Sequence, residues 1–167
     1  IFSDIVNMHS IKATTQGENA SVVLTADEGT FFKATNDIEL RKNVIANTDE
    51  GTNLKTNKLK WLASAERIVS DDQVYIKRED MTLVGRGAKA IPNMKKVWLN
   101  KDIEMTVSPK DANFAKADGD CDVTGPKTII TCDGPMEVDY QKNISYFNKN
   151  VVIKDKEGSI FADKVIV

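Results

Sequence analysis

One pattern occurs twice in this chain, and it limits the folds that the chain can adopt. Lys-Asn-Val at residues 42–44 returns at residues 149–151, and each valine is followed seven residues later by a glycine, Gly51 or Gly158. Three further apolar pairs share the offset of 107 residues: Leu40 with Phe147, Leu54 with Phe161, and Leu59 with Ile166. A fixed offset over a strand–turn–strand stretch predicts a repeated β-hairpin. Stacked hairpins form a scaffold or a conduit more often than a catalytic pocket.

Short apolar segments separated by turn residues fill the chain from Ser21 onward. Turn signals such as residues 27–29 (Asp-Glu-Gly) and 133–135 (Asp-Gly-Pro) recur about every ten residues,. Residues 103–107 alternate apolar and polar side chains, which places one apolar row on one face of a sheet,. This pattern is typical of an all-β sandwich or an open, barrel-like roll.

Residues 57–69 leave two alternatives open. Leu62, Ala65 and Ile68 also fit the apolar stripe of a helix,. The repeat favours a strand instead, because its second copy, residues 159–167, is rich in β-branched side chains,.

Residues 108–126 predict a linker or a long loop. They contain two prolines, two glycines and several aspartates, and they show little alternation,. We therefore expect a β-roll domain over residues 1–107 and a partial second β module over residues 127–167.

Composition excludes some classes of function. The net charge is only −2, without the basic face of a nucleic-acid-binding protein,. No apolar run approaches the ~18 residues of a transmembrane helix. Because the sequence starts at Ile1 rather than Met, we expect that an anchor or export signal lies outside it,.

Two cysteines flank the turn-forming residues 124–126. Cys121 and Cys132 could form a disulfide across this short loop in an oxidising compartment,. Two buried free thiols are the alternative.

Catalytic signatures are sparse. His9 is the single histidine, and its spacing from the cysteines matches neither a Cys–His nucleophile motif nor a zinc module,. Residues 85–90 contain GxGxxA, but the turn at residues 91–93 follows where a dinucleotide site needs a helix,. These glycines therefore predict a bend or bulge in a strand. We expect no cofactor, no metal and no enzymatic activity.

Two segments resemble known families. Residues 51–90 closely resemble the periplasmic domain of LptC, which belongs to the lipopolysaccharide transport bridge of Gram-negative envelopes. The matching residues are Leu54, Thr56, Leu59, Trp61, residues 66–68, Val74, Ile76, Asp80, Met81, Leu83, Gly85, Gly87 and Ala90. Residues 128–167 are similar to the LptA/OstA-type module of the same pathway. There the matches are residues 133–135, Val138, Tyr140, Phe147, Asn150, Val151, Ala162 and Asp163.

The resemblance implies an open, twisted β-jellyroll made of two antiparallel sheets. Its apolar interior would hold acyl chains, and modules would join end to end by pairing their edge strands. The implied partners are lipopolysaccharide or a related glycolipid, other Lpt-type β-jellyroll proteins, the inner-membrane ABC transporter and, head to tail, further copies of the chain. The implied location is the periplasm, with an inner-membrane anchor on a segment outside this sequence.

Alternation and family matches together predict which side chains line the interior. They are Leu40, Val44, Leu59, Trp61, Val74, Ile76, Met81, Leu83, Ile103, Met105, Phe147, Val151 and Ile153. Two other interpretations stay open. One is a structural β module with a sealed core that only joins partner proteins. The other is a carbohydrate-active enzyme, which needs two carboxylates within ~5–10 Å of each other.

Overall fold

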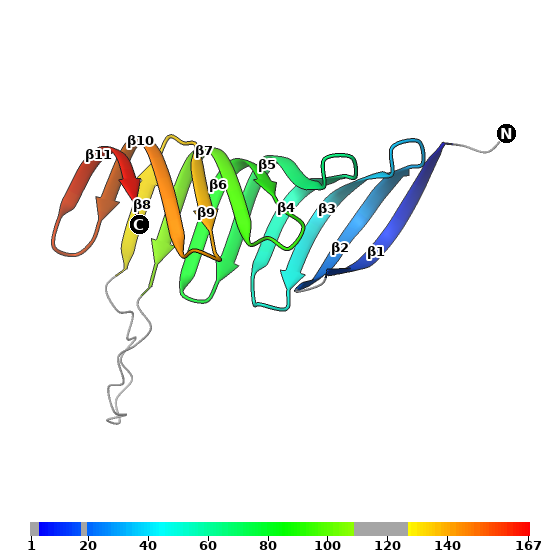
Figure 1. The fold of residues 1–167 in the computed structure, drawn as a ribbon, viewed down its shortest axis with the longest axis horizontal. Coiled ribbons are helices and arrows are strands. Elements are labelled where there is room, and N and C mark those ends of the chain that lie inside the picture. Colours follow the sequence, from blue (N-terminus) through cyan, green and yellow to red (C-terminus); the bar gives the residue numbers. More distant parts are fainter. Residues whose placement is uncertain (1–3, 18–19, 109–126) are drawn as a thin grey trace, which may run out of the picture.

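The alternating apolar pattern of the sequence produces an all-β molecule, as predicted (Figure 1). A computed structural model describes residues 4–17, 20–108 and 127–167. The strands in this part of the chain are β1 (Ile5–Gly17), β2 (Ala20–Phe32), β3 (Asp37–Thr48), β4 (Asn53–Leu62), β5 (Arg67–Arg78), β6 (Met81–Ala90), β7 (Lys96–Val107), β8 (Thr128–Cys132), β9 (Met136–Asp139), β10 (Ile144–Lys154) and β11 (Ser159–Ile166).

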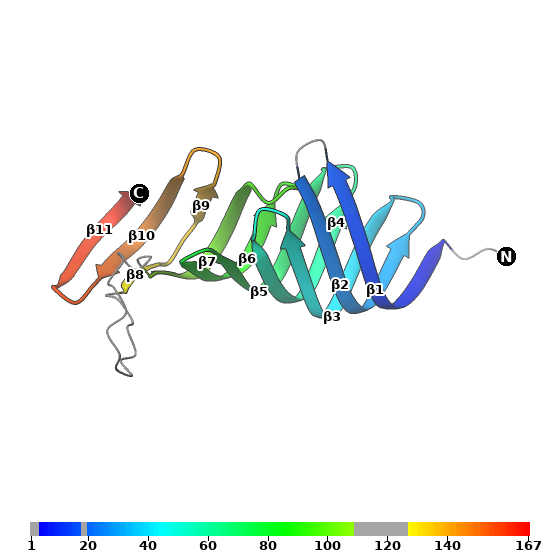
Figure 2. The same ribbon diagram turned by 90° about the horizontal axis from the view of Figure 1, so that it is seen from below.

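The strands form one continuous antiparallel sheet. From β1 to β8 each strand pairs with its successor, β10 and β11 follow, and β9 pairs with both β7 and β10. Strands β1 and β11 therefore lie at the two ends of an elongated molecule (Figures 1 and 2). The two predicted sheets are thus two halves of a single sheet.

The predicted boundary does not interrupt the sheet. Strand β8 follows residues 109–126, which lie outside the described part of the chain, and it pairs directly with β7. Ile103 lies opposite Cys132 in this pairing. The strands before and after the predicted linker therefore share one hydrogen-bonded ladder.

Bulges bend the sheet along a line that crosses neighbouring strands. Register shifts interrupt the pairing near the middle of β2, β3, β4, β5, β6 and β10. A bulge bends its strand and increases the local twist. A row of bulges therefore creases the sheet, and its two halves enclose an apolar interior.

The two copies of the repeat form equivalent structures. Residues 42–43 in β3 and residues 149–150 in β10 all have positive φ values, between 49° and 64°. Each pair forms a bulge, and each is followed by a hairpin, β3–β4 or β10–β11. The predicted repeat of a β-hairpin is therefore present.

The helical alternative for residues 57–69 is wrong. These residues form the end of β4, a turn and the start of β5. Leu59, Trp61 and Ile68 all face the interior, and Leu59 and Trp61 have the two-residue spacing of a strand,. Pairing with β3 and β5 thus overrides the local helical spacing.

The GxGxxA segment lies within β6, where a bulge was expected. The pairing of β6 with β7 shifts register between Val84 and Arg86. Gly87 has a φ of 71°, a conformation that L side chains rarely adopt,. The glycines therefore serve the bend of the strand.

Candidate functional site

An apolar cavity of about 390 Å³ lies inside the creased sheet near its β1 end. Its walls come from β1 and β2, from β3 to β5, and from the β6–β7 turn. The lining residues are Met8, Ile11, Lys12, Ala13, Val22, Leu24, Ile38, Leu40, Leu59, Trp61, Ile68 and Pro92. Among these described residues Lys12 alone carries a charge, so the cavity favours an uncharged, apolar occupant.

A glycine in β2 leaves room beside this cavity for a neighbouring side chain. Gly29 is buried and lies opposite Met8 on one side and Leu40 on the other. A methyl group added at Gly29 would collide with the side chain of Ile11 and lie 3.1 Å from Leu40 Cδ2. The missing side chain therefore allows Ile11 to take its present position in the wall.

The structure divides the predicted lining residues into two groups. Leu40, Leu59 and Trp61 line the cavity. The others lie further along the interior, where most are buried in the core and Met81 and Ile153 pack partly buried against it. The buried members are Val44, Val74, Ile76, Leu83, Ile103, Met105, Phe147 and Val151. The cavity thus occupies the β1 end, and close packing begins beyond it.

Sequence reasoning missed the contribution of β1 to the cavity. Residues 1–20 read as mixed and polar, yet Met8, Ile11 and Ala13 all line the space. Ser10 has a φ of 52° and is absent from the pairing between His9 and Ile11. This irregularity shifts the alternation by one residue, so a strict period of two does not reveal the strand.

A group of polar side chains connects segments that lie far apart in the sequence. Lys95 Nζ lies 3.0 Å from Glu50 Oε1, and Arg78 Nη2 lies 3.4 Å from Glu50 Oε2. The Arg78 guanidinium carbon also lies 4.6 Å from the centre of the Tyr140 ring,. We call Glu50, Arg78, Lys95 and Tyr140 the Glu50 clasp. It joins the β3–β4 turn to the β6–β7 turn and to the segment after β9.

The Tyr140 hydroxyl is the least satisfied part of this clasp. It is buried and has no hydrogen-bond partner in the described part of the chain. Burial raises the pKa of Tyr140 to about 12, although the nearby Arg78 charge acts in the opposite direction. The phenol therefore stays neutral at physiological pH.

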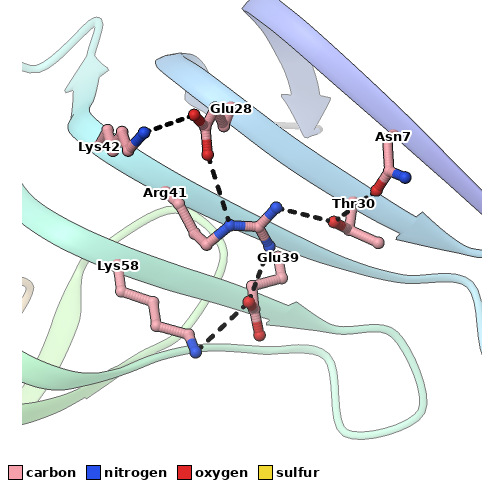
Figure 3. A network of polar contacts seen from close by, with 7 residues as sticks. All are labelled: Asn7, Glu28, Thr30, Glu39, Arg41, Lys42 and Lys58. Carbon is pink, nitrogen blue, oxygen red and sulfur yellow. Dashed lines mark hydrogen bonds and ion pairs between the residues drawn. The ribbon is translucent and has the colours of Figure 1, made fainter.

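A second polar network covers the outer face of β1–β4 (Figure 3). Glu39 accepts a hydrogen bond of 2.9 Å from Arg41 Nη1, and Lys58 Nζ lies 3.3 Å away. Glu28 Oε1 accepts a hydrogen bond of 2.6 Å from Lys42, and Arg41 also reaches Thr30. Cations therefore surround both carboxylates.

The electrostatics of this network differ from those of a glycosidase. The Lys42 hydrogen bond lowers the pKa of Glu28. Burial opposes ionisation of Glu39, but hydrogen bonds from Arg41 and Lys58 outweigh it and lower the pKa of Glu39. A glycosidase acid needs a raised pKa, so this pair does not support the enzymatic interpretation.

The remaining candidate groups do not assemble into a reactive centre. Cys132 is buried, no described residue forms a disulfide with it, and burial raises the pKa of its thiol. Cys121 lies outside the described residues, so the disulfide stays a prediction. His9 is exposed on β1. No group of three or more His, Cys, Asp or Glu side chains within residues 4–17, 20–108 and 127–167 is placed to hold a metal ion.

The last strand presents an open, apolar edge. Within the described residues, strand β11 pairs with β10 on one side, and no strand pairs with its other edge. Phe161 is 75% exposed, and Ile160 and Ile166 are also largely exposed. Unpaired edges with apolar side chains are sites where another strand can add.

Comparison with known proteins identifies one family. The family model described as "Lipopolysaccharide-assembly, LptC-related" matches residues 3–108, more than half of the chain. The matched segment contains strands β1–β7 and every residue that lines the cavity. No curated protein matches the chain. Within the described residues, no helix has the length and apolar character needed to cross a membrane.

Proposed function

This chain belongs to the LptC-related lipopolysaccharide-assembly family, and we propose that its cavity shields acyl chains of lipopolysaccharide or a related glycolipid. Members of this family are non-enzymatic transport components of the periplasm and cell envelope. The chain itself would bind and transfer lipid without catalysing a reaction.

The apolar cavity is the observation that carries this proposal. Protein interiors hold few voids larger than a water molecule, whose share of liquid volume is about 30 Å³. A cavity of about 390 Å³ is far larger than that, and it opens to solvent beside the exposed residues Lys12 and Pro92. Exposing an acyl chain to water costs ~25 cal/mol per Å², and an apolar slot removes this cost. The cavity therefore favours lipid binding over a sealed core.

Transfer requires a continuous apolar route through the molecule. Beyond the cavity the interior stays apolar as far as Phe147, Val151 and Ile153, close to β11. We propose that the predicted lining residues form this route and that the chain passes lipid toward the outer membrane. Packed side chains along the route would move aside as the acyl chains advance.

We propose partners that would dock at the ends of the sheet. Strand β11 offers its edge to another Lpt-type β-jellyroll, which would extend the sheet by strand addition,. Other proposed contacts are the inner-membrane ABC transporter and a second copy of this chain, head to tail. We propose an inner-membrane anchor on a segment outside this sequence.

We propose that two parts of the chain share this function. Residues 1–107 would act as the LptC-like jellyroll and residues 127–167 as a partial LptA/OstA-like module, connected by residues 108–126. The direct pairing of β7 with β8 supports one route that runs through both parts.

Photo-crosslinking to purified lipopolysaccharide tests lipid binding. A photoreactive phenylalanine analogue at Trp61 lies in the cavity wall, and the same analogue at Lys60 lies one residue away on the outer face. We expect labelling from position 61 and little from position 60. Equal labelling, or none from either position, would reject the proposal.

A structural module that joins partners through β11 is the second candidate, because that edge is exposed and apolar. It predicts strand pairing without lipid. Protein that binds a partner through β11 but shows no lipopolysaccharide crosslink at position 61 would favour this alternative.

A further inference from the structure

Two grooves lie on the outer face of the sheet, each beside one bulge of the repeat. The first has a volume of about 590 Å³ and is lined by Asn43, Val44, Ile45, Lys55, Thr56, Asn57, Gln73, Tyr75 and Val84. The second has a volume of about 310 Å³ and is lined by Asn150, Val151, Val152, Phe161, Ala162 and Asp163. Residues 43–45 correspond to residues 150–152, and residues 55–56 to residues 162–163, at the offset of 107 residues. The repeat therefore carries a groove as well as a bulge.

One row of residues on the outer face joins the two grooves. Cross-strand pairing runs in order through Ile45, Lys55, Tyr75, Val84, Glu104, Thr131, Val152 and Phe161. Neighbours of this row along the strands, such as Val44, Val74 and Val151, are buried in the interior, so alternation turns the row outward. From β5 to β11 the sheet order has five steps (β5-β6-β7-β8-β10-β11) of about 4.8 Å each,. Tyr75 and Phe161 are thus about 24 Å apart along the sheet.

Each groove contains an exposed aromatic ring. Tyr75 is 39% exposed and Phe161 is 75% exposed. In the first groove, Asn57 and Gln73 are also exposed, and their side-chain amides form no hydrogen bond with the described part of the chain. The ring and these amides are therefore available to a ligand.

This combination of groups suits a sugar that carries an acetamido group. A side-chain amide has two N–H donors and a carbonyl acceptor, so it can pair with both the C=O and the N–H of an acetamido group. A rigid aromatic ring supplies contact area for the apolar face of a sugar ring at a low cost in conformational entropy. Lys55 and Asp163 bring one charge of each sign to the two linings. An uncharged ligand is therefore favoured.

We propose that the outer face of the sheet binds a linear, uncharged polysaccharide that carries acetamido groups, with Tyr75 and Phe161 stacking on its sugar rings. A polymer repeats its unit along its length, so it matches two similar grooves on one row. The sheet separates these grooves from the lipid cavity, because Val44 and Val74 next to the row face the interior. The polysaccharide is thus a ligand distinct from the lipid, and this inference does not depend on lipid binding.

Calorimetric titration with chitohexaose, a soluble hexamer of N-acetylglucosamine, tests the site. The wild-type protein should bind it about tenfold more tightly than cellohexaose, which lacks acetamido groups. Tyr75→Ala should weaken chitohexaose binding about tenfold through lost apolar contact, whereas Tyr75→Phe keeps the ring and should bind almost as well as the wild type. Gln73→Ala should also weaken binding. Gln141→Ala removes an exposed amide from the β9–β10 turn and serves as its control.

A variant of the second groove tests whether both grooves hold one chain. A ligand that is bound at one groove reaches the other as an intramolecular step, so chitohexaose should bind more tightly than chitobiose, which fills one groove only. Phe161→Ala should reduce this advantage of the longer chain. An equal advantage in Phe161→Ala and the wild type would reject the second groove.

The remaining outcomes decide the proposal as a whole. Folded wild-type protein that does not bind chitohexaose, or that binds cellohexaose equally well, would overturn it. Unchanged affinity in folded Tyr75→Ala and Gln73→Ala would do the same, and Gln73→Ala decides alone if Tyr75→Ala does not fold. The lipopolysaccharide crosslink at position 61 should persist in Tyr75→Ala, because Tyr75 faces away from the cavity. A crosslink lost together with chitohexaose binding would contradict two separate ligands.

Discussion

Asn43 and Asn150 hold the same position in two bulges that lie 107 residues apart. Each has a positive φ, and each donates a hydrogen bond from Nδ2 to an aspartate that precedes it in the sequence. Asn43 reaches Asp27 Oδ2 at 2.6 Å, and Asn150 reaches Asp133 Oδ2 at 2.5 Å. Asparagine tolerates this conformation better than most residues, which explains why the repeat contains it.

Replacing Asn43 should separate the contribution of its side-chain hydrogen bond from that of its tolerance of positive φ. Asn43→Ala loses the hydrogen bond, and alanine tolerates positive φ less well than asparagine, so we expect a loss of about 1–2 kcal/mol in unfolding free energy. Asn43→Gly keeps the backbone freedom and should lose less. Urea denaturation measures both variants, and a glycine variant less stable than the alanine variant would contradict this account.

The second copy of the repeat contains one buried and one exposed phenylalanine. Phe147 is fully buried, whereas Phe161 on β11 is 75% exposed. We expect Phe147→Ala to lower the unfolding free energy by about 3–5 kcal/mol and Phe161→Ala by less than about 0.5 kcal/mol. Thermal denaturation checks both. Similar losses in the two variants would mean that β11 is covered in solution.

Gly29→Ala should displace a neighbouring side chain. The new methyl group would collide with Ile11 Cδ1, the end of a flexible side chain that borders the cavity, so it should move Ile11 from its place in the wall at a cost of about 1 kcal/mol. Lipid crosslinking at position 61 should weaken. Gly158→Ala is the control, because a methyl group there meets no atom within 4 Å. Equal stability of the two variants would show that the wall adapts without cost.

Stability should fall in acid through Glu39. Its pKa lies below the ordinary value of 4.5, because hydrogen bonds from Arg41 and Lys58 outweigh the opposing effect of burial. The stability that it contributes is therefore complete above pH 4.5 and is lost as the pH falls through the lower pKa of the folded state,. Melting temperatures between neutral and acid pH should decrease less in Glu39→Gln. An unchanged slope would mean that other carboxylates dominate.

Much of the fold could be predicted from local sequence. Alternation and turn residues indicated an all-β roll, and the repeat correctly favoured strands over a helix at residues 57–69. Strand β1 was not predicted, because the irregularity at Ser10 breaks the alternation. Whether the strands formed one sheet or two also depended on long-range pairing, which no local pattern encodes.

The candidate site was less predictable than the fold. Alternation identified side chains that face inward, such as Leu59 and Val74, but it does not distinguish a cavity wall from packed core. That difference depends on how residues from distant strands fill the shared volume. The burial of Met94 in the β6–β7 turn likewise depends on packing between segments that are distant in the sequence,.

The exposed edge of β11 has a consequence for assembly. Nothing in a ladder of backbone hydrogen bonds limits how many strands it can accept. The reach of any filament built on this edge would therefore be decided by the neighbour that caps it, and this chain would contribute one segment of fixed length.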